Sequence, residues 1–70
     1  MKFSGEALAA ARADKQLTQE ELAGLAGVST YTVSRLERDE NVPTLATLTR
    51  LARALDADPQ SLLAGDGAPA

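Results

Sequence analysis

Residues 17–37 read LTQEELAGLAGVSTYTVSRLE and contain two short helical patterns separated by a three-residue turn. Thr18 and Glu21 have the spacing of a capping box, so a helix is expected to begin at Thr18. Gly27 is expected to end this helix, because glycine adopts left-handed backbone angles without steric strain. Ser29 is placed to cap the next helix. The stretch therefore predicts a helix, a tight turn and a second helix.

The apolar residues of this stretch explain how the two helices would pack. Ala23 is small at the point where the helices are expected to cross, and Leu22, Val28, Val33 and Leu36 are placed to lock them at a steep angle. The second helix would then project from the surface. A projecting helix fits the major groove of duplex DNA, which is about 12 Å wide.

The flanking sequence supplies three more helix signals. Ser4 is expected to cap a first helix that ends near residues 15–16. Thr44 begins a fourth helix, in which leucines recur at helical spacing on one face. Asp58 and Pro59 have the residue types of a cap and a first helical position, and they predict a short fifth helix.

Composition supports an all-α fold class, and the helix signals along the chain give five helices. The chain has 70 residues, of which 44% are hydrophobic, and it holds one Phe, one Tyr and no Trp. Alanine and leucine, the strongest helix formers, supply most of the apolar content. We expect one helix-turn-helix domain over residues 1–64, with residues 65–70 as a flexible C-terminal tail or linker stump.

The absence of cysteine and histidine excludes several function classes. No nucleophile is paired with a base, so the chain is not expected to be an enzyme. Two adjacent acids, Asp39 and Glu40, make a poor metal site without further ligands, and no metal, cofactor or small-molecule ligand is expected. The N-terminus has no apolar signal core, and no apolar stretch is long enough for a membrane, so the expected localisation is cytoplasmic.

The charge balance disfavours nucleic-acid binding, whereas the projecting helix favours it. The formal net charge is −3 and the pI is about 4.7, whereas phosphate binding requires a basic face. The local placement of the charges decides this question, because a net charge does not describe a surface.

Several motifs together resemble the phage-repressor-like helix-turn-helix family, also called the Cro/cI or XRE family. They are LTQEELA at residues 17–23, GVS at 27–29, SRLE at 34–37, and PTLATLTRLARAL at 43–55. The resemblance covers about residues 5–64. It implies a five-helix lambda-repressor-like DNA-binding domain and a sequence-specific transcriptional regulator of the repressor type, reading double-stranded DNA in the major groove with the third helix.

The resemblance also assigns roles to individual residues. The base-reading positions are Thr30, Tyr31, Arg35 and, in second rank, Ser34; the phosphate-binding positions are Thr18, Gln19, Ser29, Arg38 and Asn41. An arginine can hold guanine O6 and N7 together. Arg12 and Glu37 match a structural ion pair of the family. For Arg12 we therefore favour this structural role over a DNA contact. Tyr31 has the alternative role of covering the junction between the two helices.

Two features leave alternatives open. The loop Asp39-Glu40-Asn41 is acidic where many family members are basic, which weakens the expected grip on phosphate. A homodimer through the C-terminal helix, with Leu62 and Leu63 as its uncovered side chains, would double the number of contacts with DNA.

Arg50 and Arg53 are expected to form a solvated face.

The competing function is a protein-interaction module of the same fold, such as an antitoxin-like domain that binds a partner. A third possibility is an accessory domain at the end of a longer enzyme.

Overall fold

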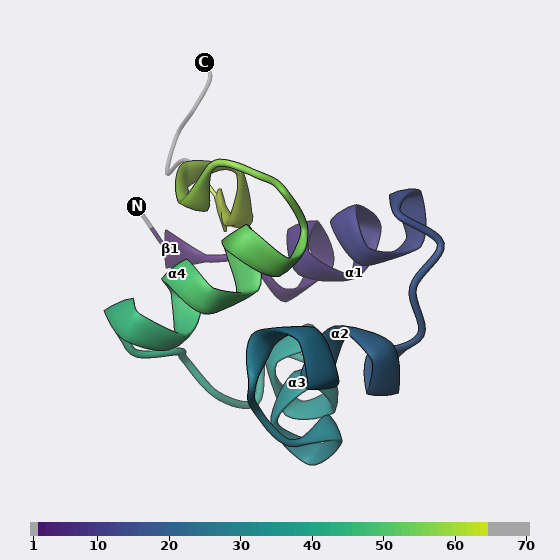
Figure 1. The fold of residues 1–70 in the computed structure, drawn as a ribbon. Coiled ribbons are helices and arrows are strands. Elements are labelled where there is room, and N and C mark those ends of the chain that lie inside the picture. The colour runs from purple at the N-terminus through teal and green to yellow at the C-terminus, as the bar shows by residue number, and fades with distance from the viewer. Residues whose placement is uncertain (1, 65–70) are drawn as a thin grey trace.

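Helices make up most of the computed structural model, which describes residues 2–64. The elements follow in the order β1 (Lys2–Phe3), α1 (Gly5–Asp14), α2 (Gln19–Ala26), α3 (Thr30–Glu37), α4 (Leu45–Ala54), η1 (Pro59–Leu62) and β2 (Leu63–Ala64). Figure 1 shows α2 and α3 packed together beside α1 and α4. Over this range no helix has both the length and the apolarity needed to cross a membrane. The predicted tail over residues 65–70 lies outside the described residues.

The predicted caps open the four α-helices. The hydroxyl oxygens of Ser4, Thr18, Ser29 and Thr44 each accept a hydrogen bond from the backbone N–H three residues later, at 3.0–3.1 Å. The capping box is complete, because the Thr18 N–H also donates to Glu21 at 2.8 Å. These contacts satisfy backbone donors that have no partner inside a helix.

The expected fifth helix is present at the predicted place, but it is a 3-10 helix and not an α-helix. Residues Pro59–Leu62 form a 3-10 helix of four residues, capped by Asp58, whose side chain accepts from the Gln60 N–H at 2.9 Å. The segment returns to extended backbone at Leu63, so it is too short for an α-helix to develop its 13-atom hydrogen-bonded rings. Within residues 2–64 the fold therefore has four α-helices and one 3-10 turn.

A two-stranded antiparallel sheet, which the sequence did not predict, joins the two ends of the described chain. Lys2 pairs with Ala64 and Phe3 with Leu63. The Ser4 N–H extends this contact by donating to the Leu62 carbonyl at 2.9 Å. Two residues per strand are too few to show the alternating pattern that identifies a strand in a sequence.

The core lies between the four α-helices and η1. Its fully buried side chains are Leu8, Leu22, Val33, Leu36, Leu51, Leu55 and Leu62. Leu62 is 0% exposed because η1 packs against both α1 and α4. The expectation that Leu62 is left uncovered for a dimer contact is therefore wrong: the chain itself covers that side chain.

The start of α1 packs directly against the end of α3. The Gly5 N–H donates to the Asp39 carboxylate at 2.9 Å. A Cβ atom at Gly5 would lie 2.3 Å from the Leu36 carbonyl oxygen, closer than any side chain tolerates. This close approach fixes where α3 ends and orients the loop that follows it.

Candidate nucleic-acid interface

The α2–α3 unit has the geometry expected from its sequence. Gly27 ends α2 in the left-handed conformation, with φ of 73°. Ala23 is 2% exposed, and Leu22, Val33 and Leu36 are fully buried. Because the inner face of α3 is held by these contacts, its opposite face is left at the surface.

The predicted base-reading residues lie together on that outer face of α3. Thr30 and Tyr31 are exposed, and Tyr31 keeps 68% of its surface accessible. Ser34 and Arg35 follow four residues later and are half-buried. Residues four apart on a helix are neighbours, so these four side chains form one patch. Tyr31 does not cover the α2–α3 junction to any large extent.

The Arg35 side chain contacts both Tyr31 and Glu40. Its guanidinium carbon lies 5.7 Å from the centre of the Tyr31 ring, within the range of a cation–π contact. Its Nη2 donates to the Glu40 backbone carbonyl at 2.9 Å, and its Nε lies 3.8 Å from the Glu40 carboxylate. The same carboxylate accepts from Arg38 Nη2 at 3.1 Å. This cluster was not predicted from the sequence, although Arg38 and Glu40 are two residues apart.

The predicted phosphate-binding residues carry local hydrogen bonds. The Thr18 and Ser29 oxygens cap α2 and α3, and the Ser29 hydroxyl donates to Thr32 at 2.9 Å. The Asn41 side-chain oxygen accepts from the Val42 N–H at 2.9 Å. These side chains are exposed at the start of α2, at the start of α3 and in the loop after α3. In the sequence, these residues precede or follow the residues of the α3 patch.

Gln19 is the predicted phosphate residue with the least freedom. It is half-buried, and its Nε2 donates to Glu37 Oε1 at 2.9 Å. An amide nitrogen carries two hydrogens, so one N–H remains for another acceptor. The contact between Gln19 and Glu37 was not predicted from the sequence, which assigned Gln19 to phosphate.

Arg12 and Glu37, the predicted structural pair, are in contact. Arg12 Nε donates to Glu37 Oε2 at 2.6 Å and Nη2 donates to Oε1 at 3.1 Å. The hydrogen bond to Glu37 raises the pKa of the Arg12 guanidinium, and burial opposes this only in part. Arg12 Nη1 also donates to the Leu17 carbonyl at 2.8 Å, which fixes the turn before α2. These contacts tie Arg12 of α1 to the last turn of α3 and to the segment before α2.

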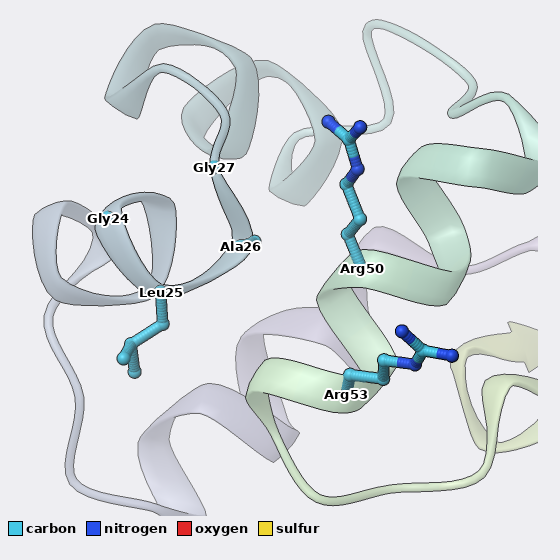
Figure 2. Close-up of a pocket in the computed structure, with 6 residues that line it drawn as sticks. All are labelled: Gly24, Leu25, Ala26, Gly27, Arg50 and Arg53. Atoms are coloured by element: carbon cyan, nitrogen blue, oxygen red, sulfur yellow. The ribbon is translucent and has the colours of Figure 1, made fainter.

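A separate hollow lies between the end of α2 and α4. It measures about 360 Å³ and is lined by Gly24, Leu25, Ala26, Gly27, Arg50 and Arg53. Figure 2 shows Arg50 and Arg53 extending from α4 in different directions, and Leu25 projecting from α2. Leu25 is 64% exposed. The hollow combines two cations with an exposed apolar side chain, and none of its residues belongs to the α3 patch.

The chain matches known proteins over most of its length. The model of a helix-turn-helix family matches residues 8–62. Antitoxin HigA1 of Mycobacterium tuberculosis is 50% identical over 52 residues, which are 74% of this chain and 35% of HigA1. The chain thus spans about a third of the length of that curated relative.

Solved structures agree with this match. The P22 c2 repressor, in complex with a synthetic operator, has a TM-score of 0.83 and 35% identity, covering 94% of this chain and 100% of that chain. The restriction-modification controller protein C.AhdI from Aeromonas hydrophila has a TM-score of 0.82 and 37% identity, covering 84% and 89%. The extent of the family match and these two structures show that the chain belongs to the phage-repressor-like helix-turn-helix family.

Proposed function

We propose that this domain is a sequence-specific duplex-DNA-binding transcriptional regulator, acting as a repressor, that places α3 in the major groove. The observation that carries the proposal is the outer face of α3, where Thr30, Tyr31, Ser34 and Arg35 form one accessible patch on a rigidly packed helix. The P22 c2 repressor, which has the same fold at 35% identity, was solved with a synthetic operator. The proposed action is binding, without catalysis or a cofactor, in the cytoplasm.

Arg35 is the proposed principal base-reading residue. Two of its nitrogens, Nε and Nη2, face Glu40, while a guanidinium has five N–H donors in all. The remaining donors suit a bidentate contact with guanine O6 and N7. Thr30 and Tyr31 offer apolar contact to a thymine methyl, and Ser34 offers a hydroxyl.

Phosphate contacts would come from the margins of the patch. The Thr18 oxygen accepts the capping hydrogen bond, which leaves its hydroxyl hydrogen for a phosphate oxygen. The second amide hydrogen of Gln19 is available in the same way. Ser29, Arg38 and Asn41 are exposed and complete the proposed set. Such contacts set position and orientation without reading sequence.

We further propose that the domain binds as a homodimer on an inverted repeat, with half-sites about 34–36 Å apart. Few cations surround α3, so one copy would bind weakly at physiological salt. The proposed surface is the C-terminal segment of residues 59–64. Because Leu62 is buried, contacts there would use the exposed Gln60, Ser61 and Ala64 with the half-buried Leu63. Sedimentation of Ser61→Glu against the parent, with and without DNA, tests this surface.

Selection from random duplex DNA tests the proposed function as a whole. The expected result is an enriched sequence, bound with an affinity that falls as salt rises. Inverted symmetry in that sequence would support the dimer. Binding that shows no sequence enrichment, or no binding to any duplex, would contradict the proposal.

A protein-interaction module is the second candidate function, favoured by the hollow in Figure 2 and by the 50% identity with antitoxin HigA1. Arg50 and Arg53 would hold carboxylates of an acidic partner segment, and Leu25 would contact its apolar side chains. The double variant Arg50→Glu, Arg53→Glu separates the two functions. If this double variant still selects the same DNA sequence as the parent, the hollow does not take part in DNA binding.

A further inference from the structure

Glu40 contacts both arginines at the end of α3. Its carboxylate oxygen Oε1 lies 3.1 Å from Arg38 Nη2 and 3.8 Å from Arg35 Nε, and its backbone carbonyl accepts from Arg35 Nη2 at 2.9 Å. These arginines are the two cations of α3 and its C-cap. One carboxylate therefore neutralises much of the positive charge beside the proposed reading patch.

The backbone holds Glu40 in this place. Its N–H donates to the Arg35 carbonyl at 2.9 Å. The preceding residue, Asp39, has φ of 58° and accepts from the Gly5 N–H with its side chain. Since the loop is tied to α1 and to α3, the carboxylate stays near the arginines even though its side chain is half exposed.

We infer that Glu40 sets the ratio of sequence-specific to non-specific DNA binding by acting as an internal counterion for Arg35 and Arg38. The inference rests on the proposed function. Non-specific binding comes almost entirely from neutralised phosphates. An arginine already paired with Glu40 must give up that pair to neutralise a phosphate, and the freed carboxylate then repels the DNA backbone.

Glu40 weakens the contact of Arg35 with a base less than it weakens contacts with phosphate. Arg35 keeps N–H donors that do not face Glu40, so it can contact a guanine while its hydrogen bond to the Glu40 carbonyl persists. The Tyr31 ring and Glu40 also limit the positions that the guanidinium can adopt, which favours one bound geometry. Glu40 therefore weakens binding to any sequence more than it weakens binding to the cognate sequence.

The variant Glu40→Gln tests this inference, because it removes the negative charge and keeps the backbone carbonyl. Binding to the selected duplex and to a scrambled duplex would be titrated between 50 and 200 mM salt. We expect the scrambled duplex to bind about threefold to tenfold more tightly at the lowest salt, with a log–log slope steeper by about 0.9 per added phosphate contact. The selected duplex should gain less, so the ratio of the two affinities falls.

Two variants serve as controls. Asp56→Asn makes the same change of net charge in the turn after α4, at a left-handed position that asparagine tolerates, and should leave the ratio unchanged. Glu40→Asp keeps the charge and should stay near the parent ratio. Equal tightening on both duplexes, or the same ratio in Glu40→Gln and Asp56→Asn, would overturn the inference alone. A folded parent that binds no duplex would overturn the proposed function and this inference with it.

Discussion

Arg12 and Glu37 join α1 to the last turn of α3 through two hydrogen bonds, at 2.6 Å from Nε and 3.1 Å from Nη2. The Glu37 side chain is only 6% exposed, and Gln19 at the start of α2 donates to the same carboxylate. Three helices therefore meet at one buried negative charge. The position of α3 relative to the start of α2 depends on that charge remaining paired.

Arg12→Ala should destabilise the fold by about 3 kcal/mol, because a buried carboxylate loses its cation. This value is at the lower end of the range for breaking a buried ion pair, because Gln19 still donates to Glu37 and Arg12 is partly exposed. Urea denaturation of the variant and the parent measures the difference. The double variant Arg12→Met, Glu37→Leu should recover much of the stability. A double variant whose loss equals the sum of the losses of Arg12→Met and Glu37→Leu, each measured alone, would show that the residues do not interact.

Gly5 and Gly24 should respond to alanine in opposite directions. At Gly5 the added Cβ meets backbone oxygens of α3 at 2.3 and 2.7 Å, so Gly5→Ala should cost about 2–3 kcal/mol. At Gly24, inside α2, the Cβ meets nothing within 4 Å. Gly24→Ala should stabilise the domain by about 0.5–1 kcal/mol, because glycine is unfavourable within a helix. Thermal unfolding compares them, and similar effects at both positions would contradict the close contact of α1 with α3.

Leu62 should behave as a core residue. Leu62→Ala leaves a cavity between η1, α1 and α4, and it should destabilise the fold by about 2–5 kcal/mol. Leu63→Ala, at the half-buried neighbour, should cost less and serves as the control. Denaturation curves at two protein concentrations check this. If Leu62→Ala changed only the concentration dependence, Leu62 would be an interface residue and not part of the core.

Local signals account for the features that the sequence predicted well. A hydroxyl three residues before a helical N–H defines a cap without any tertiary contact, which is why Ser4, Thr18, Ser29 and Thr44 could be identified. Gly27 could be placed because its left-handed turn is a property of the residue itself. The packing of α2 on α3 followed from residue size and helical spacing.

Two of the features that were missed depend on contacts between distant residues. The Asp39 side chain reaches Gly5 across 34 positions, and its sequence context is that of a solvated turn. The β1–β2 pair joins the two ends of the described chain. Glu40 was seen only as a repulsive charge, because the side-chain positions that pair it with Arg35 and Arg38 follow from the loop conformation.

DNA selection with Arg35→Ala measures whether Arg35 reads a base. We expect Arg35→Ala to lose about 1–3 kcal/mol in binding to the parent's selected duplex, and to lose the preference at one base position in each half-site. Gln19→Ala, the control at a proposed phosphate position, should weaken binding to all duplexes about equally and leave the selected sequence unchanged. A selected sequence that is the same for Arg35→Ala as for the parent would show that Arg35 does not read a base.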